Sequence, residues 1–323
     1  MDRNSVLAFL LIAIIILLMP EYYKMVYPDA QLSDSTETII NQNSTTQPDK
    51  TPPPSFEELE IDNDEEFISF DVQTNLYKAT VSNENGGAFT FYELNNYALN
   101  DSELVNLIDK SNRQNLGVSF RSIDGDLINL STGWKTTNQY DISVFSSAKT
   151  VSFYKTIENK RISKDITFYP DRYVVDIKTN LSEASDIISQ NVASISWPKG
   201  LPLTEPNRKD ELTYYSAVVY QGDESYYPKA KARGQESLEK MLYPTDWVGI
   251  RTKYFFTAFV PEAKASGAEV LAIEEGETKE YSVGLLFNTL SPFNTRLYLG
   301  PLEFNRIKKL DSSLDQIMNF GWA

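Results

Sequence analysis

The chain has 323 residues with 45 acidic and 30 basic side chains, a formal net charge of −15, and neither cysteine nor histidine. The acidic balance argues against nucleic-acid binding, which needs concentrated Lys and Arg. The missing residue types exclude disulfides, thiolate metal sites and every catalytic triad that relies on histidine.

Residues 1–27 are predicted to anchor the chain in a membrane. Arg3 precedes an unbroken apolar run of 13 residues from Val6 to Leu18, and no small-residue cleavage motif follows that run. A helix over residues 5–27 would be roughly 34 Å long, enough to cross a bilayer. We expect an uncleaved transmembrane helix with a cytoplasmic N-terminus, the alternative being a removed signal peptide. The candidate membrane-interface residues here are Tyr22, Tyr23 and Tyr27.

Residues 28–66 are predicted to be a disordered acidic and polar linker. They hold eleven acidic residues and one base, Lys50, together with the run TPPP. Such a composition buries too little apolar surface to offset the entropy of ordering. The segment reads as a tether that holds a domain away from the membrane, or as a spacer with no function of its own.

From Phe67 onward, apolar side chains alternate with polar ones in the two-residue period of strands. The clearest runs are Tyr173, Val175 and Ile177, then Val283, Leu285 and Phe287, and the pair Phe89 and Phe91. Turn sequences such as Asn85-Gly86-Gly87 and Glu158-Asn159 separate these runs. About 12 strands or more are expected between residues 67 and 300, forming a mainly β, antiparallel sandwich.

Two later stretches depart from simple alternation. Residues 222–245 are expected to be a surface excursion with a helical turn around Gln235–Leu242. Residues 246–263 are expected to form one strand, with Trp247 in the core. Arg251 and Lys253 would lie on the solvent-exposed face of that strand. The basic group Lys229, Lys231 and Arg233 is a candidate contact for lipid headgroups or an acidic partner, or a solvated loop.

Residues 302–323 are predicted to be helical. One helix would present Phe304, Ile307 and Leu310, and a second would begin at Asp311 or Ser312. The apolar face of that second helix would hold Leu314, Ile317 and Met318. Phe320 and Trp322 follow and are candidate membrane-interface residues.

No sequence motif indicates covalent chemistry. There is no glycine-rich phosphate loop, metal-ligand cluster or nucleophile elbow, and the paired acids Glu57-Glu58 and Glu65-Glu66 fall in the linker. We therefore expect no catalytic, cofactor-binding or metal-binding residues, no cofactor, and a protein that is not an enzyme.

Four segments resemble the bacterial YidC-type membrane protein insertases. They are MDRNSVLAFLLIAIIILLMP at 1–20, KDITFYPDRYVVDIKTNL at 164–181, DWVGIRTKYFFTAFVPEA at 246–263, and YLGPLEFNRIKKL with LDQIMNFGW between 298 and 322. The resemblance runs along the whole chain. It implies a β-supersandwich periplasmic domain at 67–301, held at the inner membrane by the N-terminal helix.

The resemblance also implies an activity. Such proteins act as insertases and chaperones that help inner-membrane proteins insert and fold, alone or beside the Sec translocon. The implied partners are the lipid bilayer, Sec translocon components and nascent inner-membrane proteins. The family's membrane core, with its groove arginine, has no matching position here, so we expect a fragment that does not insert proteins by itself, with 302–323 leading toward that core.

Two other classes of function stay open from the sequence. One is a membrane-anchored carbohydrate-binding or carbohydrate-active supersandwich protein, although mutarotase-like enzymes of that fold rely on histidine and this chain has none. The other is an unrelated anchored β-domain.

Overall fold

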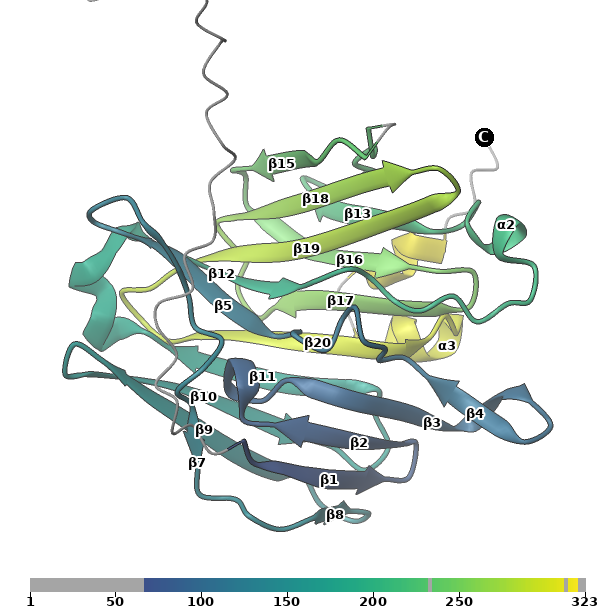
Figure 1. The fold of residues 1–323 in the computed structure, drawn as a ribbon, viewed down its shortest axis with the longest axis horizontal. Coiled ribbons are helices and arrows are strands. Elements are labelled where there is room, and N and C mark those ends of the chain that lie inside the picture. Colours follow the sequence, from purple (N-terminus) through teal and green to yellow (C-terminus); the bar gives the residue numbers. More distant parts are fainter. Residues whose placement is uncertain (1–66, 232–233, 311–312, 319–323) are drawn as a thin grey trace, which may run out of the picture. The chain divides into compact units, whose positions relative to one another are not determined.

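The computed structural model describes residues 67–231, 234–310 and 313–318, which form a mainly β structure of three sheets (Figure 1). The predicted anchor and linker, and the residues Arg233, Phe320 and Trp322, lie outside the described residues. Twenty strands are described, more than the sequence suggested, because several are only two to four residues long. Every pair of these strands is antiparallel except β1 and β8.

The largest sheet has nine strands and backs the other two. Figure 1 shows the six-stranded sheet over one half of it and the five-stranded sheet over the other. In spatial order its strands are β14 (Glu224–Tyr226), β13 (Ser216–Gln221), β16 (Thr245–Arg251), β17 (Phe255–Pro261), β20 (Phe293–Pro301), β11 (Val174–Asn180), β10 (Lys160–Phe168), β9 (Lys149–Ile157) and β7 (Lys135–Thr136).

The two smaller sheets complete the sandwich. The six-stranded sheet runs β15 (Ser237–Met241), β18 (Gly267–Glu275), β19 (Thr278–Asn288), β12 (Ile188–Trp197), β5 (Gly117–Ser122) and β6 (Leu127–Asn129). The five-stranded sheet runs β4 (Glu103–Asn106), β3 (Phe89–Asn100), β2 (Tyr77–Ser82), β1 (Ser69–Thr74) and β8 (Ile142–Val144). The helical turns are η1 (Glu84–Gly86), η2 (Ser182–Ile187), α2 (Arg208–Glu211), α3 (Phe304–Ile307), η3 (Lys308–Leu310) and η4 (Leu314–Met318).

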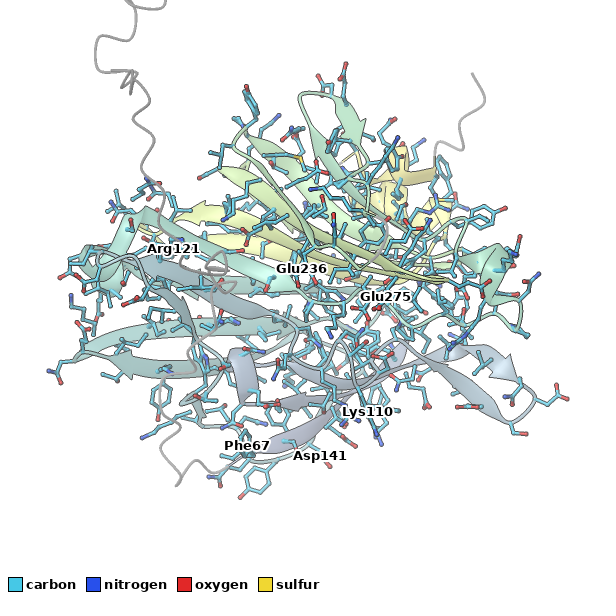
Figure 2. All side chains as sticks on the ribbon, turned by 45° about the horizontal axis from the view of Figure 1, so that its top comes forward. Phe67, Lys110, Arg121, Asp141, Glu236 and Glu275 are labelled. Carbon is cyan, nitrogen blue, oxygen red and sulfur yellow. The ribbon has the colours of Figure 1, made fainter. Side chains whose placement is uncertain are left out.

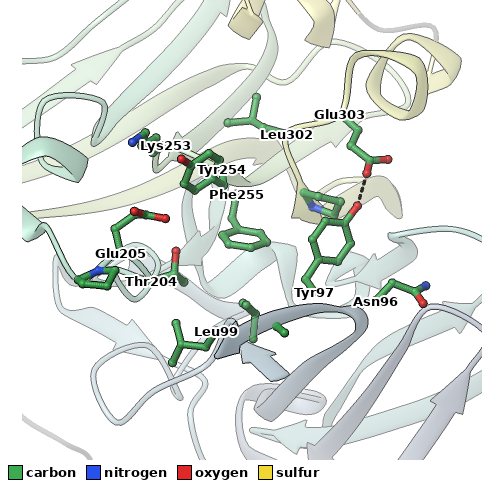
Figure 3. A pocket seen from close by; sticks show the side chains of 14 residues that line it. Asn96, Tyr97, Leu99, Thr204, Glu205, Lys253, Tyr254, Phe255, Leu302 and Glu303 are labelled. Carbon is green, nitrogen blue, oxygen red and sulfur yellow. Dashed lines mark hydrogen bonds between the residues drawn. The ribbon is translucent and has the colours of Figure 1, made fainter. Parts of the chain in front are cut away.

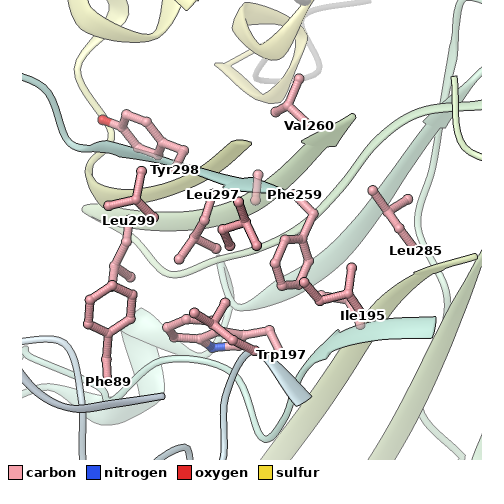
Figure 4. Close-up of a cluster of buried hydrophobic side chains, with 14 of the residues drawn as sticks. Phe89, Ile195, Trp197, Phe259, Val260, Leu285, Leu297, Tyr298 and Leu299 are labelled. Carbon is pink, nitrogen blue, oxygen red and sulfur yellow. The ribbon is translucent and has the colours of Figure 1, made fainter. Parts of the chain in front are cut away.

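The core lies between the facing sheets and is filled by the alternating side chains that the sequence predicted. Ile195 and Trp197 of β12 are fully buried and share one cluster with Phe259 of β17 (Figure 4). Each such side chain contributes about 1.5–3 kcal/mol through burial. The predicted inward runs in β11 and β19 are confirmed, because Ile177 and Leu285 are also buried.

The prediction for β3 is wrong at Phe91. Thr80 pairs with Phe91 but the next residue, Val81, pairs with Phe89, so Thr90 is the extra residue of a β-bulge. A bulge changes which residues face inward on its two sides. Tyr92 is buried in consequence, and Phe91 is only partly buried.

The prediction of one continuous strand over 246–263 is also wrong. Strand β16 ends at Arg251, the chain turns at Thr252, Lys253 and Tyr254, and β17 returns antiparallel to it. Arg251 therefore does not lie on a solvent-exposed face, and only 7% of its surface is exposed. The prediction that Trp247 belongs to the core is confirmed by its exposure of 0%.

The helical turn expected at Gln235–Leu242 is a strand instead. Residues Ser237–Met241 form β15, which pairs with β18 in regular antiparallel register. Helix-favouring residues such as Leu238, Glu239 and Lys240 adopt a strand here because pairing with a neighbouring strand outweighs a weak local preference.

The predicted C-terminal helical segment is present as three short turns, α3, η3 and η4. Ile307, Leu314 and Ile317 are 0–1% exposed and join the main core, so the apolar stripe of the second turn is confirmed. Phe304 is 47% exposed whereas Ile307 is 1% exposed, so the stripe predicted for the first turn is buried at Ile307 but not at Phe304. No helix within the described part of the chain has both the length and the apolar character required to traverse a bilayer.

Gly87 closes the tight turn between β2 and β3 with a φ of +113°. A β-carbon there would lie 2.4 Å from Cδ1 of Ile166 and 2.8 Å from Cε2 of Phe153. Gly87→Ala is expected to cost about 2–4 kcal/mol of unfolding free energy, from backbone strain and overpacking together. Urea unfolding measures the loss of unfolding free energy. The control is Gly125→Ala, where φ is +96° but no atom lies within 4 Å of the added β-carbon, so only backbone strain should lower the unfolding free energy. Equal losses for the two variants would contradict the packing argument.

Candidate functional site

Only two of the residues that the sequence singled out as contacts fall in the described part of the chain. Lys229 and Lys231 are both exposed, and Lys231 forms an isolated bridge to Ile273 of β18, next to the start of β15. This exposure is what both the solvated-loop interpretation and the partner-contact interpretation predict for the pair. Neither residue lies in the pocket described below.

A pocket of about 440 Å³ opens at the end of the sandwich where four separate segments meet (Figure 3). One wall is the β3–β4 hairpin, another is residues 204–206, a third is the β16–β17 turn, and the last is residues 301–303. Most lining side chains are apolar or aromatic: Tyr97, Ala98, Leu99, Val105, Pro206, Tyr254, Phe255, Pro301 and Leu302.

Tyr97 joins the hairpin to the C-terminal segment at one side of the pocket. Its hydroxyl donates to the carboxylate of Glu303, and its ring meets Phe255 edge-on with centroids 6.0 Å apart. Arg306 donates from Nε to the same carboxylate at 2.5 Å, and its guanidinium lies over the ring of Tyr173. Four side chains from three parts of the chain are thus linked in one series of contacts, from Tyr97 through Glu303 and Arg306 to Tyr173.

The charges in this network are fixed by their neighbours. Burial and the hydrogen bond to Glu303 raise the pKa of Tyr97, so its hydroxyl stays protonated and keeps donating. Burial opposes the ionisation of Glu303, but the bonds from Tyr97 and Arg306 outweigh it and hold the pKa of this carboxyl below its usual range. The polar groups of Tyr97, Glu303 and Arg306 are thus hydrogen-bonded to one another within the chain.

The opposite wall is held by an ion pair and a buried carboxylate. Nζ of Lys253 lies 2.7 Å from Oδ2 of Asp210, and this hydrogen bond raises the pKa of Lys253. Glu211 is fully buried and accepts from the backbone N–H of Glu205 at 2.8 Å. These contacts fix α2 and residues 204–206 beside the β16–β17 turn.

Arg251 secures the C-terminal segment behind the pocket. Its Nη1 donates to the carbonyl oxygen of Ile317 at 2.8 Å, while Arg296 donates from Nη1 to the carbonyl of Leu310 at 3.1 Å. Burial lowers the pKa of Arg251. No local pattern in the sequence indicates this role, because the contact joins residues 66 positions apart.

Arg251→Leu is expected to release the segment at 314–318 and to cost about 1.5–3 kcal/mol, the usual worth of a charged hydrogen bond. Hydrogen exchange of the amides of 314–318 should quicken, while the amides of β17 stay protected. Lys253→Leu, next to it but more exposed, is the matched control and should leave that exchange unchanged. Unaltered exchange at 314–318 in Arg251→Leu would show that the bond does not hold the segment.

The arrangement is suited to binding. Glu303 and Lys253 are ion-paired within the chain, and the pocket offers a ligand a mixed surface, aromatic and aliphatic side chains beside the polar ones of Asn96, Thr204 and Glu205. Such a pocket accepts apolar side chains and fixes them with few polar contacts. No group of three or more metal-ligating side chains occurs among the residues that the structure describes.

Comparisons with known proteins give a consistent result. The family model described as the YidC periplasmic domain matches residues 69–323. The membrane protein insertase YidC of Chlorobium limicola is 27% identical over 338 residues, covering 100% of this chain and 58% of that protein. The insertase of the same name from Chlorobaculum tepidum is 28% identical over 349 residues, with the same coverage. The chain therefore spans 58% of the length of these relatives.

Similarity to solved structures is weak. The 4-alpha-glucanotransferase from Thermococcus litoralis aligns with a TM-score of 0.37 and 10% identity, over 74% of this chain and 40% of that one. A similarity at this level carries no argument about fold or activity.

Proposed function

Because the chain belongs to the YidC family, with that family's periplasmic domain over residues 69–323, we propose that it forms the part of a membrane protein insertase that lies outside the cytoplasm. Residues 1–27 would anchor it in the inner membrane with the N-terminus in the cytoplasm, and 28–66 would tether the sandwich. Residues 67–301 would form a β-supersandwich, and 302–323 would lead toward the membrane.

One observation carries this proposal: the family model spans nearly the whole described sandwich, and relatives named insertases match the full length of the chain. The pocket supports a binding role within that family, because Lys253 and Glu303 are ion-paired within the chain and aromatic and aliphatic side chains line much of the space between them. Insertion of a membrane protein makes and breaks no covalent bond. The sandwich would act as a chaperone-like surface for nascent inner-membrane proteins and for components of the Sec translocon.

A chimera tests the insertase assignment. This chain would be joined to the remaining part of the Chlorobaculum tepidum relative and produced in cells depleted of their own insertase. We expect the chimera to restore insertion of a reporter membrane protein, scored by protease accessibility of its translocated loop, and this chain alone not to restore it. Restoration by the chain alone, or failure of a stable, membrane-bound chimera, would overturn the assignment.

A cross-linking arm tests the role of the sandwich itself. A photo-reactive residue would replace Leu99, which lines the pocket and is 43% exposed, or Tyr140, which is 79% exposed and lies beside β8. In the chimera we expect adducts with nascent membrane protein or translocon components from position 99 and few from position 140. Equal yields from the two positions would remove the pocket from the proposal.

A further inference from the structure

Exposed apolar side chains gather in one stretch outside the pocket. Between Tyr226 and Tyr243 five large hydrophobic residues are 43–71% exposed. They are Tyr226, Tyr227, Leu238, Leu242 and Tyr243. Scattered single residues of this kind are ordinary on a protein surface, whereas a cluster marks an interaction site.

This stretch contains β15, the terminal strand of the six-stranded sheet, with β18 on its inner side. No further strand pairs with the outer side of β15 among the described residues. An unpaired strand edge presents backbone N–H and C=O groups that can pair with another extended chain. Whether another chain can pair with this edge depends on the side chains around it, because charged side chains oppose such pairing.

Charged side chains usually protect an exposed edge, but those of β15 are engaged within the chain. Glu239 accepts from the hydroxyl of Tyr226 at 2.6 Å, and Nζ of Lys240 lies 3.2 Å from Oε2 of Glu269. The side chain of Lys240 remains 51% exposed, but its charge is paired with the neighbouring strand β18. The β15 edge is thus apolar at Leu238, Leu242 and Tyr243. The charged side chains between them, Glu239 and Lys240, have partners within the chain.

The two ends of this edge differ in character. Lys231, Glu236 and Glu275 lie at the end where β15 begins, so that end holds charges of both signs (Figure 2). Leu242 and Tyr243 lie at the other end and are 71% and 69% exposed. Because the charged end has mixed signs and the strand itself is neutralised, the complementary partner is uncharged and apolar.

We propose that the β15 edge binds an extended, uncharged, apolar polypeptide segment by β-strand addition. This rests on the proposed function, in which the segments supplied to the site are parts of membrane proteins that have not yet entered the bilayer. The backbone of β15 gives the affinity, and Leu238, Leu242 and Tyr243 select apolar side chains in the incoming strand. The site is separate from the pocket, whose lining shares no residue with it.

The test uses the purified chain and a fluorescent peptide of about nine residues, the length of an ordinary strand, that alternates leucine with threonine. A second peptide carries proline at alternate threonines and cannot donate the ladder hydrogen bonds. We expect the alternating peptide to bind, as measured by fluorescence anisotropy, and the proline peptide to bind at least about tenfold more weakly. Equal affinities for the two peptides, or no binding of either, would overturn the proposal.

Variants of the chain locate the site. The double variant Leu238→Lys and Leu242→Lys places two unpaired charges on the edge and is expected to weaken peptide binding at least about tenfold. Ile123→Lys is the matched control, since Ile123 is 66% exposed beside β5, toward the opposite edge of the same sheet. It should change the affinity less than about twofold. Equal effects of the two changes would overturn the assignment to β15.

Two further outcomes are decided by the same materials. Sedimentation of the chain alone as a dimer that Leu242→Lys dissolves would identify a second copy as the occupant and would overturn the polypeptide-segment proposal. The insertion assay with the chimera is independent of peptide binding. If the chimera inserts the reporter but the chain binds no peptide, the proposed function stands and this inference is refuted. If the chain binds the peptide but the chimera does not insert the reporter, peptide binding at β15 stands and the proposed function is refuted.

Discussion

Replacing Trp247 with alanine is expected to lower the free energy of unfolding by about 3–5 kcal/mol. Trp247 is fully buried in β16, stacks on Tyr220 with ring centroids 5.5 Å apart, and meets Phe256 edge-on at 6.0 Å. Alanine would remove these contacts and leave a cavity that β16, paired on both sides, is poorly placed to close. Urea unfolding followed by far-UV circular dichroism measures the loss.

Trp247→Phe separates packing from hydrogen bonding. The indole Nε1–H of Trp247 has no hydrogen-bond partner among the described residues, so phenylalanine removes an unsatisfied donor while keeping most of the aromatic contact. This variant should cost about 1–2 kcal/mol, well below the alanine variant. A loss under about 1 kcal/mol for Trp247→Ala would show that the β13–β16–β17 region is not a stabilising core.

Raising the pH from 7.5 to 9 is expected to stabilise the domain by about 2 kcal/mol through Lys164 alone. Lys164 is fully exposed in an unfolded chain, where its pKa is about 10.4, but burial lowers its pKa to about 7 in the folded domain. Between these values the unfolded state binds the proton and the folded state does not, so stability rises with pH. Below pH 7 both states are protonated, and the folded state then bears a buried charge.

The geometry around Lys164 explains why it is tolerated. Its Nζ donates to the carbonyl oxygens of Asn85 at 2.5 Å and Leu116 at 2.6 Å, and lies 5.5 Å from the ring centre of Trp134. A neutral amine keeps two N–H donors, one for each carbonyl. The side chain therefore ties the turn before β3 to the start of β5 from inside the core.

Lys164→Met is the variant that tests this prediction. It should remove the rise in stability between pH 7.5 and 9, whereas Lys178→Met, on the exposed side of β11, should preserve it. The absence of histidine and cysteine makes this window unusually clear, because few other groups titrate in it. A pH slope that survives in Lys164→Met would refute the assignment to Lys164.

The sequence was sufficient for the parts of the fold that depend on local pattern. Alternating apolar residues located β11 and β19, and Glu158-Asn159 located the β9–β10 hairpin, where both residues have positive φ as the turn requires. The burial of Trp247 also followed from its place in an apolar run. These features depend on residues near one another in the chain.

The features that the sequence did not reveal depend on contacts between distant residues. Periodicity cannot show that Thr90 is a bulge residue, nor that Arg251 meets a carbonyl 66 positions later. The pocket likewise joins residues near 97, 205, 254 and 302, and no spacing rule relates them. Strand β15 was missed because its residues favour helix locally and its pairing with β18 is supplied by the sheet.

We propose that the sandwich lies outside the cytoplasm as a binding module of an insertase, and labelling of a single cysteine tests this proposal directly. Since the chain has no cysteine, Tyr140→Cys, at a position that is 79% exposed, introduces a single thiol. The chain would be produced in bacterial cells, and spheroplasts would be treated with a maleimide that does not cross the bilayer. If the sandwich lies outside the cytoplasm, as this proposal requires, labelling on intact spheroplasts should equal labelling after lysis. Labelling that appears only after lysis would place the sandwich in the cytoplasm and contradict it.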